Sequence, residues 1–155
     1  SSDVCSSDLR DHSVQTERSK YLRDLGIPLN TDSTLRGQFI FLAERATELL
    51  YENIITDRTI WDVSAFTLSA KSIKDWEKRD FVTAAMHLKD YYDVVIYVSP
   101  DGVDMEDNGI RETDLTYRTK IDQVIRMLLE EYKPNKLITV SGSTNDRIAT
   151  ILSNL

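Results

Sequence analysis

The sequence is poor in the residues that build disulfides and zinc sites. It has one cysteine, Cys5, in 155 residues, so neither an internal disulfide framework nor a thiolate metal cluster can form from this chain. Its two histidines, His12 and His87, lie far apart without ligand spacing. A zinc site is therefore not expected.

Long apolar runs are also missing. No stretch is long enough to span a bilayer, and the N-terminus lacks the hydrophobic segment of a secretory signal. We therefore expect a cytoplasmic protein with no membrane contact.

Positive charge is in deficit. The chain has 19 Lys and Arg against 26 Asp and Glu, a net charge of −7. This balance disfavours nucleic-acid partners, which bind through basic patches. Small phosphate ligands stay possible, because a few arginines can make one cleft positive on an acidic protein.

What is present is typical of one globular domain, with 41% hydrophobic residues. Residues 1–9 (SSDVCSSDL) show no helix or strand period and resemble a translated library adaptor, with a native flexible tail as the alternative. We assign 1–12 to an adaptor-like or disordered tail and 13–155 to the domain.

Strand and helix patterns alternate along that domain. The expected strands are 13–16, 53–56, 93–99 and 136–140, and the expected helices are 17–25, 35–49, 59–68, 72–90, 113–132 and 144–152. In the second helix Leu35, Phe39 and Leu42 begin an apolar stripe predicted to pack on a sheet. The alternation predicts an α/β fold, a parallel sheet with helices on both faces.

Ligands of such folds bind beyond the carboxyl ends of the strands. Asp57 and Arg58 follow the strand at 53–56. The carboxylate suits magnesium or a base, and the guanidinium suits phosphate oxygens. On the dipeptide alone, an N-cap aspartate beside an exposed arginine is the stronger interpretation.

Other candidates follow the remaining strands. Arg111 and Arg118 flank a Gly109 turn and are suited to cover a transferring phosphoryl group, although single arginines are more often solvated. Glu17 suits a base or a hydroxyl ligand, or simply the first turn of a helix. Ser141 and Ser143 suit the lining of a base-binding pocket, or a plain strand-to-helix turn with Ser143 or Thr144 as the helix cap. Phe66 suits the wall of a ring-shaped substrate site, or the core.

Four stretches carry a resemblance to a known family: 17–27 (ERSKYLRDLGI), 54–66 (IITDRTIWDVSAF), 108–118 (NGIRETDLTYR) and 139–148 (TVSGSTNDRI). In order and spacing they resemble the nicotinamide-riboside-kinase type of P-loop, AAA-like ATPase domain, which is frequent in phages. The resemblance covers about residues 13–155. Asn108 departs from it, because an Asp is common at that place in the lid.

This resemblance implies an ATP-dependent transferase that moves the γ-phosphate to a nucleoside-like, ribosylnicotinamide-like acceptor, with ATP and Mg²⁺ as cofactors and a lid at about 101–118. It implies the following roles: Asp57 at magnesium or as base; Arg58, Arg111 and Arg118 at the phosphoryl group; Glu17, Asp62 and Phe66 at the substrate; Ser141, Ser143 and Arg147 near adenine.

The phosphate-binding signature of that family is missing. No G-x-x-x-x-G-K-[ST] occurs, and none of the five glycines precedes a Lys-Ser/Thr pair. The family places this loop before Glu17, after the central strand of a sheet ordered second, third, first, fourth, fifth. We therefore expect an N-terminally truncated domain with two unpaired strand edges, unstable and inactive alone, from an active parent enzyme.

Two alternatives remain open. A nucleoside monophosphate kinase would use the same Asp-Arg corner and lid, but needs more arginines facing the acceptor. A non-catalytic nucleotide-binding or interaction domain would keep the fold without turnover. Convergence of Asp57, Arg58, Arg111 and Arg118 on one cleft would favour an enzyme. The sequence leaves the oligomeric state undetermined.

Overall fold

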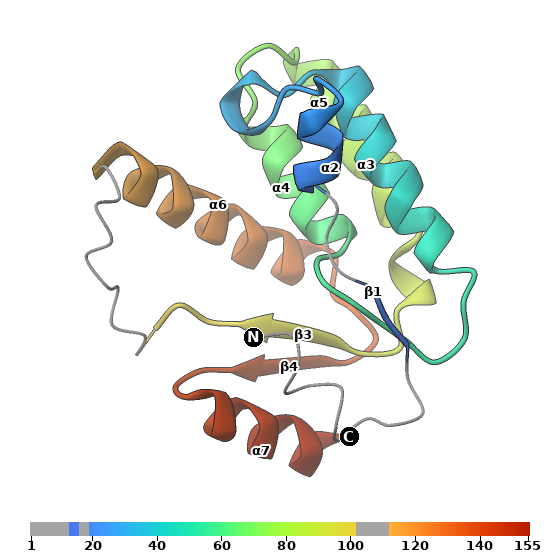
Figure 1. Ribbon diagram of the computed structural model, residues 1–155, viewed down its shortest axis with the longest axis vertical. Helices are drawn as coiled ribbons and strands as arrows, with labels where there is room; N and C mark the ends of the chain where they lie inside the picture. Colours follow the sequence, from blue (N-terminus) through green and yellow to red (C-terminus); the bar gives the residue numbers. More distant parts are fainter. Residues whose placement is uncertain (1–12, 16–18, 102–111) are drawn as a thin grey trace.

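A computed structural model describes residues 13–15, 19–101 and 112–155 (Figure 1). Two predicted site residues, Glu17 and Arg111, lie outside the described residues, as do Asn108 and most of the predicted lid. The tail at 1–12 lies outside them as well.

Helices and strands alternate along the described chain. The strands are β1 (Ser13–Gln15), β2 (Ile54–Thr56), β3 (Val95–Val98) and β4 (Leu137–Val140), and the α-helices are α2 (Ser19–Asp24), α3 (Leu35–Glu48), α4 (Ile60–Ser69), α5 (Asp75–Met86), α6 (Glu112–Glu131) and α7 (Thr144–Asn154). Short 3-10 helices occupy Asn30–Asp32 and Lys89–Tyr91. The expected elements are all present, most of them shorter by one to several residues than the sequence patterns predict.

The strands form two parallel pairs. β1 lies beside β2, with Val14 opposite Ile55, and β3 lies beside β4, with Ile96 opposite Ile138. The prediction of an α/β protein with parallel strands is confirmed. In the described chain the two pairs do not join into one sheet, because no ladder connects β2 to β3.

The β3–β4 pair lies between two helices (Figure 1). α6 covers one face, and α7 packs along β4 on the other face. On the face opposite α6, Ile96 and Val98 of β3 remain 38% and 50% exposed. The layer of helices on that side is therefore incomplete over β3.

α4 is the central helix of the protein. Thr59 caps its first turn, and Asp62 returns the bond: the Asp62 carboxylate accepts from the Thr59 backbone N–H at 2.7 Å. Because α4 packs against α3, α5 and α6, it is apolar on most sides and buries Ile60 and Trp61 completely. The Trp61 indole N–H donates to the Tyr132 carbonyl at 3.0 Å, which ties α4 to the end of α6.

The prediction that the apolar stripe of α3 packs on a sheet was wrong in part, because α3 packs mainly on α4. Phe39 is 49% exposed, whereas the buried positions of α3 include Gln38, Arg45 and Glu48. α3 turns a polar stripe inward because these side chains find partners there: Gln38 Nε2 donates to the Thr67 hydroxyl at 2.9 Å and to the Val63 carbonyl at 3.2 Å. A hydrogen-bonded polar group is tolerated in a core.

Candidate functional site

A groove separates the two strand pairs. Its walls include β2 (54–56) and β3 together with residues of α4, α6 and α7, and its volume is about 1150 Å³. Within the described chain, β2 pairs only with β1 and β3 only with β4, so each strand presents one open edge. Open edges carry N–H and C=O groups that need hydrogen-bond partners.

Five of the predicted site residues line this groove: Asp57, Arg58, Asp62, Phe66 and Arg118. They come from the turn after β2, from α4 and from the start of α6, which the fold brings to one place. The groove therefore brings three of the four predicted catalytic residues together, and the fourth, Arg111, lies outside the described residues.

The turn after β2 has an unusual backbone. Arg58 has φ 74°, in the left-handed region that non-glycine residues rarely occupy. Two bonds hold the turn: the Thr56 hydroxyl donates to the Arg58 carbonyl at 3.0 Å, and Arg45 Nη1 donates to the Asp57 carbonyl at 2.8 Å. Strained residues of this kind concentrate at functional sites.

Both side chains of this corner are exposed. The Arg58 guanidinium carbon lies 5.2 Å from the centre of the Phe66 ring, so the cation stacks on an aromatic face. The alternative interpretation of Asp57 as the cap of the next helix was wrong, because Thr59 is that cap. The Asp57 carboxylate has no role in the local helix start.

Arg45 supports the corner from the interior. Its side chain is 3% exposed, and Nη2 lies 2.9 Å from a Glu48 carboxylate oxygen. This buried pair fixes the donor that holds the Asp57 carbonyl. Sequence reasoning missed Arg45, although an Arg and a Glu three residues apart on one helix are a recognisable pair.

Asp62 is a desolvated acid. Burial raises the pKa of its carboxyl group, and the bonds from Thr59 and the charge of Arg58 oppose this rise in part. The carboxyl group both closes the capping box of α4 and lines the groove. Asp62 thus has a local structural role, and its predicted substrate role stays a prediction.

The residues predicted near adenine lie after β4. Ser143 caps α7, and its hydroxyl accepts from the Asp146 N–H at 3.2 Å, as the structural alternative expected. Arg147 Nε donates to the Gly142 carbonyl at 3.0 Å. Ser141, Ser143 and Arg147 are not among the lining residues of the groove.

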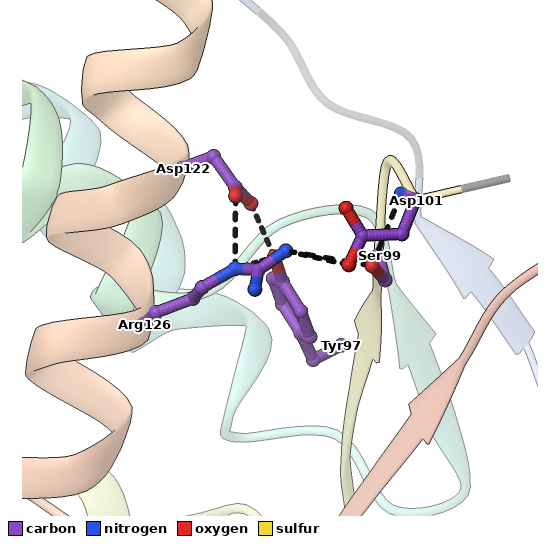
Figure 2. A network of polar contacts seen from close by, with 5 residues as sticks. All are labelled: Tyr97, Ser99, Asp101, Asp122 and Arg126. Carbon is purple, nitrogen blue, oxygen red and sulfur yellow. Dashed lines mark hydrogen bonds and ion pairs between the residues drawn. The ribbon is translucent and has the colours of Figure 1, made fainter. Parts of the chain in front are cut away.

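A second polar cluster borders the groove at the end of β3 (Figure 2). The Tyr97 hydroxyl donates to Asp122, and Arg126 Nε donates to both Tyr97 and Asp122, at 2.8 and 2.9 Å. Arg126 Nη2 reaches Asp101 at 3.3 Å and Ser99 at 3.5 Å. The cluster joins α6 to the segment that leaves β3.

The cluster changes the acidity of its members. Burial, followed by the bond to Asp122, raises the pKa of Tyr97 to about 12. The Ser99 hydroxyl and then Arg126 lower the pKa of Asp101. Sequence reasoning pointed to the loop after Ser99 but not to Tyr97 or Arg126, whose only signal was the four-residue spacing of Asp122 and Arg126.

No cluster of three or more His, Cys, Asp or Glu side chains suited to a metal ion occurs among residues 13–15, 19–101 and 112–155. None of the helices in these ranges is long and apolar enough to cross a membrane.

Comparisons of the chain with protein-family models, with curated proteins and with solved structures find no match.

Proposed function

We propose that this chain is the greater part of an ATP-dependent small-molecule kinase that phosphorylates a hydroxyl of a nucleoside-like acceptor. The observation that carries the proposal is that Asp57, Arg58 and Arg118 line one groove at the carboxyl end of β2. This combination of one carboxylate and two guanidinium groups suits phosphoryl transfer, because charge develops on several oxygens at once.

The roles follow from chemistry and exposure. Arg58 and Arg118 bind oxygens of the transferring group, and Asp57 orients the acceptor hydroxyl and takes up its proton. Asp57 is exposed at the end of β2. A single carboxylate fits Mg²⁺, which is commonly held by one or two carboxylates together with substrate phosphates. Mg²⁺ and ATP, when bound, supply charge neutralisation and the phosphoryl group.

The chain itself has no phosphate-binding loop, since G-x-x-x-x-G-K-[ST] is missing. We propose that a further strand enters the groove and leads into that loop. The open edges of β2 and β3 support this proposal. A strand there would satisfy both edges, and an accompanying helix would cover Ile96 and Val98.

An acceptor without a phosphate group is favoured over a nucleoside monophosphate. The monophosphate alternative needs several arginines on the acceptor side. Arg45 and Arg58 both line a smaller cavity between α3 and α4, but Arg45 already binds Glu48 and the Asp57 carbonyl. One available guanidinium group is a weak site for a phosphate ester.

The test is to sequence the source DNA upstream of residue 12, to express the longer reading frame, and to follow ATP-dependent phosphorylation of a nucleoside panel by phosphorus NMR. We expect the loop signature after a strand, turnover by the longer chain, and no tight Mg-ATP binding by the 155-residue chain. Asp57→Asn should lower turnover about 10²–10⁴-fold, with Asp80→Asn, an exposed position outside the groove, as the matched control.

Native upstream sequence without the loop would contradict the proposal and favour a non-catalytic domain. Full turnover by the Asp57→Asn variant would contradict the assigned role of the carboxylate.

A further inference from the structure

The charged lining of the groove is mostly acidic. Among the described residues it consists of two arginines, Arg58 and Arg118, and four aspartates, Asp57, Asp62, Asp93 and Asp122. Carboxylates repel phosphate oxygens, and they also compete for the guanidinium groups that bind those oxygens. Such a groove therefore binds an anion well only where the carboxylates next to its arginines are held by other groups.

Asp122 is the natural competitor for Arg118. The two residues lie four positions apart on α6, and side chains at this spacing are neighbours on the surface of a helix. They do not form an ion pair in the structure, and Arg118 has no ion-pair partner among the residues that the structure describes. Its exposed guanidinium group is thus available to a ligand in the groove.

Two other groups hold the Asp122 carboxylate (Figure 2). The Tyr97 hydroxyl donates to one of its oxygens, and Arg126 Nε donates to the other at 2.9 Å. The Asp122 side chain is 22% exposed. Because each carboxylate oxygen already has a partner, little is gained when Asp122 turns to Arg118.

Arg126 is in turn anchored at the end of β3. Its Nη2 lies 3.3 Å from an Asp101 carboxylate oxygen and 3.5 Å from the Ser99 hydroxyl, and its guanidinium carbon lies 5.5 Å from the centre of the Tyr97 ring. Arg126 is not a lining residue of the groove. It therefore offsets the charge of Asp122 from outside the groove, without occupying the space of a ligand.

We propose that Arg126 is a positioning residue for anion binding: it holds the Asp122 carboxylate and so keeps Arg118 unpaired and able to bind the oxygens of a polyphosphate in the groove. Without Arg126, Asp122 pairs with Arg118 across one helical turn and places an uncompensated negative charge beside the anion. The inference rests on the proposed function, because it takes Arg118 as a phosphate-binding residue.

The test measures the binding of inorganic tripolyphosphate to the 155-residue chain, by calorimetry and by NMR of the arginine Nε–H signals. Low ionic strength is used because salt screens exposed charges. The Arg118 signal is identified by its loss in Arg118→Gln. We expect tripolyphosphate to shift this signal, and Arg126→Gln to weaken binding about three- to tenfold. An unshifted Arg118 signal, or unchanged affinity in Arg126→Gln, would overturn the proposal.

A double variant separates the competition by Asp122 from a structural contribution of the cluster. Arg126→Gln/Asp122→Asn lacks the competing carboxylate as well, so it should bind tripolyphosphate as tightly as the parent chain. If it binds no more tightly than Arg126→Gln, the cluster acts only as a tie between α6 and β3, and the proposal is refuted. Circular dichroism and the urea midpoint establish that both variants are folded.

The matched control is Lys120→Gln, which removes one positive charge from an exposed position of the same helix, outside the groove. It should weaken binding far less than Arg126→Gln. A loss as large as that of Arg126→Gln would show an effect of net charge alone and would count against the assigned role.

The two proposals fail in different ways. Tripolyphosphate binding with the expected pattern, combined with no phosphoryl transfer by the longer chain, would refute the kinase and leave the role of Arg126. Phosphoryl transfer by the longer chain with kcat and the KM for ATP both unchanged in Arg126→Gln would refute the role of Arg126 and leave the kinase.

Discussion

Two arginines tie a helix to the end of a strand in this protein, in opposite surroundings. Arg45 of α3 reaches the end of β2 with 3% of its side chain exposed, whereas Arg126 of α6 reaches the end of β3 with 45% exposed. Both bind a carboxylate and a group at the strand end. Similar contacts therefore contribute differently to the free energy of unfolding, because removing one partner from a buried pair costs far more than removing one from a solvated pair.

Arg45→Met, which removes the buried arginine behind the turn after β2, gives the largest expected effect. The substitution leaves the Glu48 carboxylate without its cation and removes the donor to the Asp57 carbonyl. We expect the free energy of unfolding to fall by about 3–5 kcal/mol, measured by urea denaturation.

The matched control for Arg45→Met is the double variant Arg45→Met/Glu48→Leu, which removes both charges. It should recover most of the lost stability, since an apolar pair of similar volume replaces a buried ion pair at little cost. A single variant that unfolds at the parent's urea midpoint would contradict the weight given to burial.

Asp62→Asn tests the same corner through pH, with a smaller effect. The raised pKa means that the native protein keeps a proton that the unfolded chain has released. The native state then binds more protons, so stability falls as pH rises from about 4, the ordinary value for Asp, through the raised native pKa. In Asp62→Asn this fall should disappear in urea titrations across that window, and an identical pH profile would contradict it.

At the exposed cluster after β3, Tyr97→Phe should lower stability below pH 10, where the hydroxyl is bonded, and this deficit should vanish as pH rises to 12. The native pKa of about 12 lies above the ordinary value of about 10, so the tyrosine contributes stability that is complete below pH 10 and lost as pH rises to 12. The variant should lack this loss. Ultraviolet titration of tyrosine ionisation in the parent and in the variant provides the measurement, with the exposed Tyr91→Phe as the control. If Tyr97→Phe removes a tyrosine that ionises near the ordinary value of about 10, the prediction is contradicted.

Arg126→Gln should have the smallest effect. Its partners Asp101 and Asp122 can turn to water when the guanidinium is removed, so the urea midpoint should move far less than in Arg45→Met. High salt should reduce even that difference. An effect as large as that of Arg45→Met would contradict the conclusion that burial decides how much such a contact contributes to stability.

Much of the fold could be predicted from local sequence. The run at 93–99 indicated a parallel strand, and the alternation of strands and helices indicated the α/β class, which the two parallel pairs confirm. Asp57 and Arg58, at the end of β2, line the groove together with Arg118 of α6, whereas Ser141 and Ser143, at the end of β4, do not. Strand ends are predictable because they follow directly from element order.

What depended on tertiary partners could not be predicted. Phe39 belongs to a regular apolar stripe, yet Gln38 and Arg45 turn inward because α4 and the turn after β2 offer them hydrogen-bond partners. Nor does periodicity indicate that Arg58 adopts a left-handed backbone or that Arg126 reaches Tyr97 across 29 residues. These contacts join segments that no sequence window contains.

The position of Trp61 has an optical consequence. The chain has two tryptophans: Trp61 is buried and lines the groove, whereas Trp76 of α5 is exposed. Because indole emission moves to shorter wavelength in apolar surroundings, Trp61 emits on the blue side of Trp76. Replacing Trp76 by Phe would leave Trp61 as the single tryptophan, at the wall of the groove, so its emission, excited selectively over tyrosine, can report on the filling of that groove without any added label.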